Sequence, residues 1–180
     1  MGLPVALMEP NSVIGLANLL MAPFISRAYT AFALSEKHFS QEFIRRYGVP
    51  LRPGFEPKPY ARSEEKLKIL VLGGSQGAKA LNEVLPKTFS ELKTSLSIVH
   101  QCGHAHLEAV RARYKKSGYQ SAEIVPFIED MPRALENADL VVGRAGAGAV
   151  SEILAVGRPS LLIPYPFASG DHQRLNAQTL

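Results

Sequence analysis

The sequence predicts an α/β fold built on a doubly wound parallel sheet, and three features of its 180 residues indicate this class. From Leu67 onward, short apolar runs alternate with segments of helical periodicity, as in parallel sheets whose crossover helices cover both faces. Glycine-rich turns follow several of the apolar runs. Hydrophobic residues make up 46% of the chain and charged residues 20%, so the chain can bury a core and is unlike a disordered chain.

Residues 1–50 predict a separate piece made of two strands and two helices. The expected elements are a strand and turn at 2–11, a helix at 14–29, a strand at 30–34 and a helix at 35–48. Because two strands do not form an independent sheet, we expect residues 12–32 to expose apolar surface where they lack sheet partners. A connector follows, with prolines at Pro50, Pro53, Pro57 and Pro59.

The rest of the chain predicts five strands with a helix after each. We expect strands at residues 67–74, 96–103, 122–127, 139–144 and 159–166. We expect helices at 77–92, 104–118, 130–138, 147–157 and 171–180. We expect Asp130 to cap the helix at 130–138 and Pro86 to kink the helix at 77–92. We expect Gly118 and Gly157 to end the helices at 104–118 and 147–157. In a sheet of this kind, ligands bind at the carboxyl ends of the strands.

Two glycine-rich turns at those strand ends, 73–77 and 143–148, favour an anionic ligand. Glycine lets backbone N–H groups approach an anion, and a helix N-terminus adds partial positive charge. Two such turns suit a diphosphate, although glycines needed only for turn sterics are an open alternative. Glu152 lies about two turns into the second helix, where it can accept hydrogen bonds from a ribose diol or act as a simple partner of the helix dipole.

Several other function classes lack their expected residues. The net charge of +4 suits an anionic ligand, but the basic residues are scattered and no nucleic-acid motif is present. An NAD site would require an acid after the second strand, where "SIVHQCG" has none. His104 and His106 point to different helix faces, so no metal site is expected. A single Cys102 excludes an internal disulfide, and no spacing indicates a catalytic nucleophile.

An ordered set of motifs resembles one enzyme family. The chain contains, in order, "GGSQGA", "HQCG", "PFIEDM", "ADLVVGRAGAGAVSEILAVGRPSLLIPYP" and "DHQRLNA". Before them, "GLPVALMEPNSVIGLANLL" is similar to a segment that usually contains H-E-Q-N in one family, and "YGVPLR" is similar to the G-N-P-V-R motif of the same family. This order resembles the MurG family, the bacterial UDP-N-acetylglucosamine:lipid I N-acetylglucosaminyltransferases of peptidoglycan synthesis.

The resemblance implies a GT-B architecture of two Rossmann-like domains. Residues 1–52 would then end the N-terminal acceptor domain, 53–66 would link the domains, and 67–180 would form a donor-binding domain truncated at its C-terminus. The family transfers GlcNAc from UDP-GlcNAc to the muramyl 4-hydroxyl of lipid I, with inversion, to give lipid II. The implied setting is the cytoplasmic face of the bacterial membrane, as a peripheral enzyme that needs no metal or cofactor and binds no nucleic acid.

The resemblance also implies the donor contacts. Asn11 matches the H-E-Q-N asparagine near the sugar, and Arg52 matches the G-N-P-V-R arginine that faces the diphosphate. Ser75 matches the serine near the same diphosphate, and Ile128 matches the residue whose backbone reads uracil. The turn that cradles phosphates and nucleoside matches Gly146, Ala147, Gly148, Ala149, Val150 and Ser151. Glu152 matches the acid that holds the ribose, and Gln173, with His172 beside it, matches the residues that read GlcNAc hydroxyls.

The chain departs from the family pattern at five positions. Met8 and Pro10 replace the histidine and glutamine of H-E-Q-N, and Val49 replaces the asparagine of G-N-P-V-R. Ala145 and Ala149 stand where hydroxyl side chains are frequent, which would weaken binding by about 0.5 to 1.5 kcal/mol per lost neutral hydrogen bond. The family's candidate general base is expected to lie outside this chain.

Two alternatives remain open at the level of sequence. The chain can be a catalytically inactive nucleotide-binding fragment, which the absence of an acceptor domain and the altered turn favour. It can also be a related GT-B enzyme, such as a lipid galactosyltransferase or a UDP-GlcNAc epimerase.

Overall fold

The computed structural model of the chain describes residues 3–62, 66–74, 76–92 and 94–179. These residues form two compact units. The first unit contains residues 1–52, 145–151 and 164–180, and the second contains residues 53–144 and 152–163.

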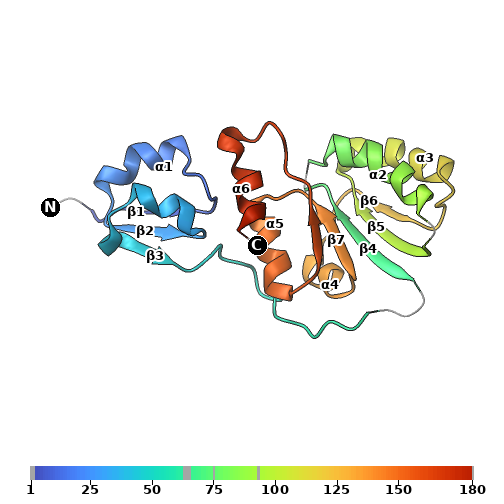
Figure 1. Cartoon of the computed structure of the whole chain (residues 1–180), viewed down its shortest axis with the longest axis horizontal. Coiled ribbons are helices and arrows are strands. Elements are labelled where there is room, and N and C mark those ends of the chain that lie inside the picture. The colour runs from blue at the N-terminus through green and yellow to red at the C-terminus, as the bar shows by residue number, and fades with distance from the viewer. Residues whose placement is uncertain (1–2, 63–65, 75, 93, 180) are drawn as a thin grey trace. The chain divides into compact units, whose positions relative to one another are not determined.

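The second unit contains a five-stranded sheet in which every pairing is parallel. Its strands are β4 (Leu67–Leu72), β5 (Leu96–Gln101), β6 (Glu123–Val125), β7 (Leu140–Gly143) and β8 (Ser160–Leu162). Their order in the sheet is β6-β5-β4-β7-β8 (Figure 1). The chain therefore moves outward from β4 in one direction, returns to the other side of β4 and continues outward, which confirms the predicted doubly wound α/β class.

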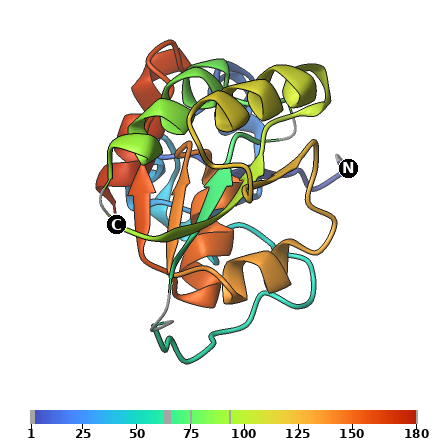
Figure 2. The same cartoon turned by 90° about the vertical axis from the view of Figure 1, so that its right-hand side faces the viewer.

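Helices cover both faces of this sheet, as predicted. Two of them, α2 (Lys79–Glu91) and α3 (Leu107–Lys116), lie on one face, whereas α4 (Met131–Glu136) and α5 (Ala147–Val156) lie on the other (Figure 2). The core under α2 and α3 includes Ile69, Val71, Leu81, Leu85, Phe89, Ile98, Val110 and Tyr114.

The predicted helix signals are largely confirmed. Oδ1 of Asp130 accepts a hydrogen bond from the N–H of Arg133 at 3.1 Å and caps α4. Gly118 and Gly157 have φ values of 86° and 74°, the left-handed conformation that ends a helix. The helix α2 continues through Pro86 to Glu91.

The first unit contains a smaller parallel sheet with the order β1-β2-β3. Its strands are β1 (Ala6–Glu9), β2 (Arg27–Thr30) and β3 (Ile44–Arg46), accompanied by α1 (Leu16–Met21) and the short 3₁₀ helices η1 (Ala22–Phe24), η2 (Ala33–His38) and η3 (Gln41–Phe43). Farther along the chain, this unit adds η5 (Ser169–Asp171) and α6 (His172–Gln178). The small core contains Ile25, Ala28 and Phe39.

Three sequence predictions fail in this unit. The helix expected at 14–29 ends early, because Arg27–Thr30 alternates exposed and buried side chains and forms a strand. The strand expected at 30–34 is wrong, because the Ser35 hydroxyl donates to the Phe32 carbonyl at 2.9 Å and turns the chain. The helix expected at 35–48 is wrong as well, since pairing with β2 draws its last residues into β3.

The predicted exposure of apolar surface is confirmed at α1 and η1. No residue of α1 is buried, and Leu16, Leu20 and Phe24 are 72%, 65% and 71% exposed. Among the described residues, no helix combines the length and the hydrophobicity that crossing a membrane requires.

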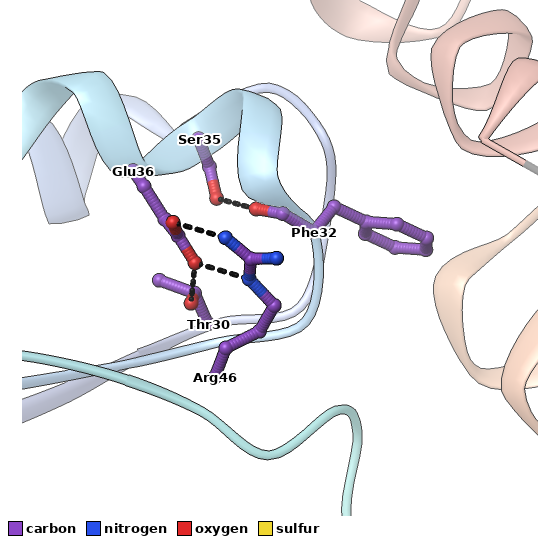
Figure 3. A network of polar contacts seen from close by, with 5 residues as sticks. All are labelled: Thr30, Phe32, Ser35, Glu36 and Arg46. Carbon is purple, nitrogen blue, oxygen red and sulfur yellow. Dashed lines mark hydrogen bonds and ion pairs between the residues drawn. The ribbon is translucent and has the colours of Figure 1, made fainter.

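An ion pair joins the end of β3 to η2. Glu36 is buried, and its carboxylate accepts two hydrogen bonds of 2.6 Å from the Arg46 guanidinium and one of 2.8 Å from the Thr30 hydroxyl (Figure 3). The hydrogen bond from Arg46 is the main cause that lowers the pKa of Glu36 below its usual value. The pair therefore helps to hold β3 in the sheet.

We predict that Glu36→Gln lowers the free energy of unfolding by about 1 to 2 kcal/mol at pH 7. Because the folded pKa of Glu36 is lowered, this contribution is present above the unfolded pKa and is lost as the pH falls through the folded pKa. Urea unfolding at successively lower pH should show the difference between wild type and variant shrinking as the pH falls. Glu42→Gln, which changes an exposed acid nearby, should match the wild type throughout. A difference between wild type and Glu36→Gln that does not shrink as the pH falls would contradict the assignment.

Candidate functional site

The order of the strands reverses direction between β4 and β7. Their last residues are direct neighbours, since Leu72 pairs with Gly143. On one side of β4 the chain runs to β5 and β6, and on the other side it runs to β7 and β8. This reversal is where doubly wound sheets bind ligands, and both predicted glycine-rich turns begin at these two strand ends.

The turn after β4 packs closely on the turn after β5. A Cβ atom on Gly77, whose φ is 76°, would lie 2.1 Å from the carbonyl oxygen of Cys102. A Cβ atom on Gly103 would lie 2.7 Å from the nitrogen of Gly77. The fold itself therefore requires glycine at both positions. Ser75, the predicted diphosphate contact in this turn, lies outside the described residues.

The turn before α5 is different, because the fold does not require its glycines. Gly146 and Gly148 have no positive φ, and a Cβ atom on either would meet no atom within 4 Å. Turn sterics therefore do not account for these two residues. They leave open space at the first turn of a ten-residue helix, where backbone N–H groups lack partners within the helix.

The other predicted residues of this turn follow the helix geometry. Ala147 and Val150 are buried, and Ala149 and Ser151 are half-buried. The N–H of Val150 donates to the carbonyl of Gly146 at 2.9 Å, so the helical bonding pattern begins there. Glu152 is half-buried on the same helix.

Ile128 lies in the loop after β6, and its backbone is engaged within the protein. Its N–H donates to Oε1 of Gln101 at 3.0 Å. Gln101 is 3% exposed, and its backbone carbonyl also accepts the N–H of Gly73 at 3.1 Å. One residue at the end of β5 thus joins two of the loops at the carboxyl edge. A nucleobase that accepts a hydrogen bond from the N–H of Ile128 would have to displace the Gln101 side chain from that N–H.

In the first unit, Asn176 on α6 organises the segment around Asn11. Asn176 is fully buried, and its Nδ2 donates to Oδ1 of Asn11 at 3.2 Å and to the carbonyl of Ala145 at 3.1 Å. Its Oδ1 accepts the N–H of Ser12 at 2.8 Å. The side chain of Asn11 is therefore oriented by a partner 165 residues away in sequence.

The carboxylate of Glu9 fixes the same segment from the other side. It accepts hydrogen bonds from the N–H groups of Asn11 and Gly15 at 3.0 and 2.8 Å, and from the amide of Asn18 at 2.9 Å. Glu9 is 2% exposed. Of the departures from the family pattern, Met8 contributes its carbonyl to Asn18 at 2.9 Å, a contact that does not depend on its side chain.

The predicted sugar-reading residues stabilise their own loop. Oε1 of Gln173 accepts the N–H of Tyr165 at 2.9 Å, and Nδ1 of His172 lies 2.8 Å from the carbonyl of Ser169. Asp171 has a φ of 55°, a left-handed conformation that is uncommon for a residue other than glycine. The predicted diphosphate contact Arg52 is exposed.

A hollow in the second unit does not coincide with the predicted site residues, apart from Ile128. A cavity of about 480 Å³ lies beside α4 on one face of the sheet and extends back to Lys68 at the opposite end of β4. Its lining reaches the carboxyl end of β6 at Val125 and the loop that follows, which includes Phe127 and Ile128. In the part of the chain that the structure describes, no three metal-binding side chains gather at one place.

Curated relatives match the chain over nearly its whole length. A relative from Sorangium cellulosum, named UDP-N-acetylglucosamine–N-acetylmuramyl-(pentapeptide) pyrophosphoryl-undecaprenol N-acetylglucosamine transferase, is 50% identical over 184 residues, which cover 100% of this chain and 45% of the relative. One of the same name from Solibacter usitatus is 41% identical, over 98% of this chain and 50% of its own length. The chain thus spans about half the length of the curated relatives it matches.

Solved structures show the same fold. The crystal structure of Acinetobacter baumannii MurG matches with a TM-score of 0.78 and 36% identity, over 98% of this chain and 50% of that one. The kitacinnamycin glycosyltransferase matches with a TM-score of 0.57 and 20% identity, over 86% of this chain and 40% of its own, which supports the fold alone. The predicted GT-B fold class and the resemblance to MurG are confirmed.

A family model gives the assignment. The model described as the glycosyltransferase family 28 C-terminal domain matches residues 68–180, which include the whole five-stranded sheet after the first residue of β4. The chain therefore belongs to glycosyltransferase family 28.

Proposed function

We propose that this chain supplies the donor-binding part of an enzyme that transfers GlcNAc from UDP-GlcNAc to lipid I, giving lipid II in peptidoglycan synthesis. The names and the 41 to 50% identity of the relatives support this substrate pair. The acceptor lipid would place the enzyme at the cytoplasmic membrane surface, as a peripheral protein. The candidate general base is not among the residues assigned above.

The observation that carries the proposal is the open space at Gly146 and Gly148. Among the described residues, no atom lies within 4 Å of a Cβ built at either glycine, whereas a diphosphate lying against the backbone N–H groups would account for two small residues at this helix start. The helix N-terminus would stabilise the negative charge of UDP as it leaves, without a metal. Arg52 and Ser75 would add charge and a hydroxyl to the same group.

The remaining assignments divide the donor among the other residues. Ile128 would contact the uracil, Glu152 would accept hydrogen bonds from the two ribose hydroxyls, and Asn11, His172 and Gln173 would face the sugar. In Gln173 the amide oxygen is already engaged by Tyr165, so its NH₂ group is the part that meets a sugar hydroxyl. The reaction would then depend on positioning and on electrostatic stabilisation of the leaving group.

We predict that Glu152→Ala weakens UDP binding by about 10- to 150-fold, from the loss of charge-assisted hydrogen bonds worth about 1.5 to 3 kcal/mol. Calorimetry with UDP and 2′-deoxy-UDP separates the ribose role from a dipole role. The wild type should prefer UDP, and Glu152→Ala should bind both ligands equally.

Glu108→Ala provides a matched control, because Glu108 lies in the first turn of a helix, α3, where its carboxylate is exposed and paired with Arg111. This variant should bind UDP as the wild type does. If Glu152→Ala retains the full preference for UDP, Glu152 does not hold the ribose. If the wild type binds no UDP, the proposed function is wrong.

A further inference from the structure

A chain of buried polar side chains runs through the second unit, outside the residues assigned to the donor. Tyr114, His100 and Asn82 are each at most 2% exposed. The Tyr114 hydroxyl lies 3.0 Å from Nδ1 of His100, and Nε2 of His100 lies 3.0 Å from Oδ1 of Asn82. Nδ2 of Asn82 donates to the carbonyl of Cys102 at 3.0 Å. The three side chains come from α3, β5 and α2 and end at one backbone carbonyl.

The last contact fixes the direction of every hydrogen bond in this chain. A carbonyl can only accept, so the NH₂ group of Asn82 faces Cys102 and its oxygen faces His100. The histidine must then carry its proton on Nε2 and accept the Tyr114 hydroxyl proton at Nδ1. Burial lowers the pKa of His100 to about 4, so the ring is neutral at pH 7.

The carbonyl at the end of the chain lies directly under the glycine-rich turn after β4. It is the atom that a Cβ on Gly77 would approach to 2.1 Å. A Cβ atom on the next residue, Gly103, would lie 2.7 Å from the Gly77 nitrogen and 2.8 Å from the backbone of Gln76. Any movement of the Cys102 carbonyl must therefore displace the turn, because no side chain lies between them to absorb the movement.

We propose that Asn82, oriented by His100 and Tyr114, is a positioning residue that sets the shape of the turn after β4 for a diphosphate. The proposal rests on the donor-binding function proposed above. Replacing all partners of a buried hydrogen bond by apolar groups of the same shape can be nearly neutral for stability, so stability alone does not explain three polar side chains in this core. Their chain of hydrogen bonds ends at the Cys102 carbonyl and holds it against Gly77.

The variant Asn82→Asp tests this at constant side-chain size. It replaces the donor that faces the Cys102 carbonyl with an oxygen, so the two repel and the turn shifts. NMR titration of the full chain with UDP and with uridine, which lacks the diphosphate, gives the readout. We expect the Kd for UDP to rise at least about tenfold and the Kd for uridine to stay within about twofold.

Equal weakening of the binding of both ligands, or no weakening of UDP binding, overturns the proposal while leaving UDP binding by the wild type intact. If the wild type binds no UDP, the proposed function fails, and this inference fails with it.

Tyr114→Phe keeps the proposal testable if Asn82→Asp does not fold. It removes only the hydroxyl at the far end, so we expect the Kd for UDP to rise two- to threefold. Tyr119→Phe, a tyrosine outside the chain of hydrogen bonds, should leave it unchanged. The ¹⁵N shifts of the His100 ring in the wild type should show Nε2–H and unprotonated Nδ1 down to about pH 5. An Nδ1–H tautomer, or equal UDP affinity in Tyr114→Phe and wild type, contradicts the proposal.

Discussion

Replacing Gly77 with alanine is expected to lower the free energy of unfolding by about 3 kcal/mol or more. The new Cβ atom would lie 2.1 Å from the carbonyl oxygen of Cys102, far inside any real contact distance. That oxygen belongs to the backbone and is held by Asn82, while the Cys102 N–H is bonded to the Val125 carbonyl at 3.0 Å. Neither partner can rotate away, so the strain moves the turn or the strand end.

Gly74→Ala provides the matched control in the same turn. Gly74 and Gly77 have φ values of 74° and 76°, but a Cβ atom on Gly74 would meet nothing within 4 Å. Gly74→Ala therefore carries only the left-handed backbone cost of about 1 to 2 kcal/mol. Urea unfolding followed by circular dichroism should show midpoints in the order wild type, Gly74→Ala, Gly77→Ala. Equal midpoints for the two variants would show that the turn relaxes without cost.

The second unit was predictable from sequence because its signals are local. Each of its strands is a short apolar run, and the turns and caps at Asp130, Gly118 and Gly157 depend on neighbouring residues. The pattern failed in residues 27–48 because long-range partners decide the structure there. Arg46 pairs with Glu36, and β3 pairs with β2, and neither contact changes the periodicity of the sequence.

Long-range contacts also explain why the sequence did not reveal the residues that support the candidate site. Gln101 and Asn176 act on residues 27 and 165 positions away. A weak signal was present, since polar His100 and Gln101 interrupt an apolar strand and Asn82 interrupts the buried face of a helix. A polar residue in such a position needs a partner, but only the fold identifies it. Sequence spacing also could not separate glycines that the fold requires, such as Gly77, from those that it does not, such as Gly146.

A buried arginine supports the other face of the sheet, and its loss is expected to have an effect of similar size. Arg158 is 7% exposed, and the structure pairs it with backbone carbonyls. Its guanidinium donates to Leu135 and Glu136 at the end of α4, to Val156 and Gly157 at the end of α5, and to Lys58 in the proline-rich segment. The ring of Tyr60 lies 5.7 Å from its central carbon. One cation thus serves the negative ends of two helices and fixes residues 58–60 beside them.

We therefore expect Arg158→Ala to lower the free energy of unfolding by about 3 to 5 kcal/mol, because it leaves several buried carbonyls without a donor. Arg158→Lys should recover less than half of this loss, since an ammonium group places its donors at one point and cannot reach both helices and Lys58. Arg111→Ala, which removes an exposed arginine paired with Glu108, should cost less than about 1 kcal/mol.

Limited proteolysis adds a local readout, because release of Lys58 should make residues 53–62 cleavable in Arg158→Lys before the domain unfolds. If Arg158→Lys is as stable and as protease-resistant as the wild type, charge alone holds these helix ends, and the spread of the guanidinium donors is not what joins them.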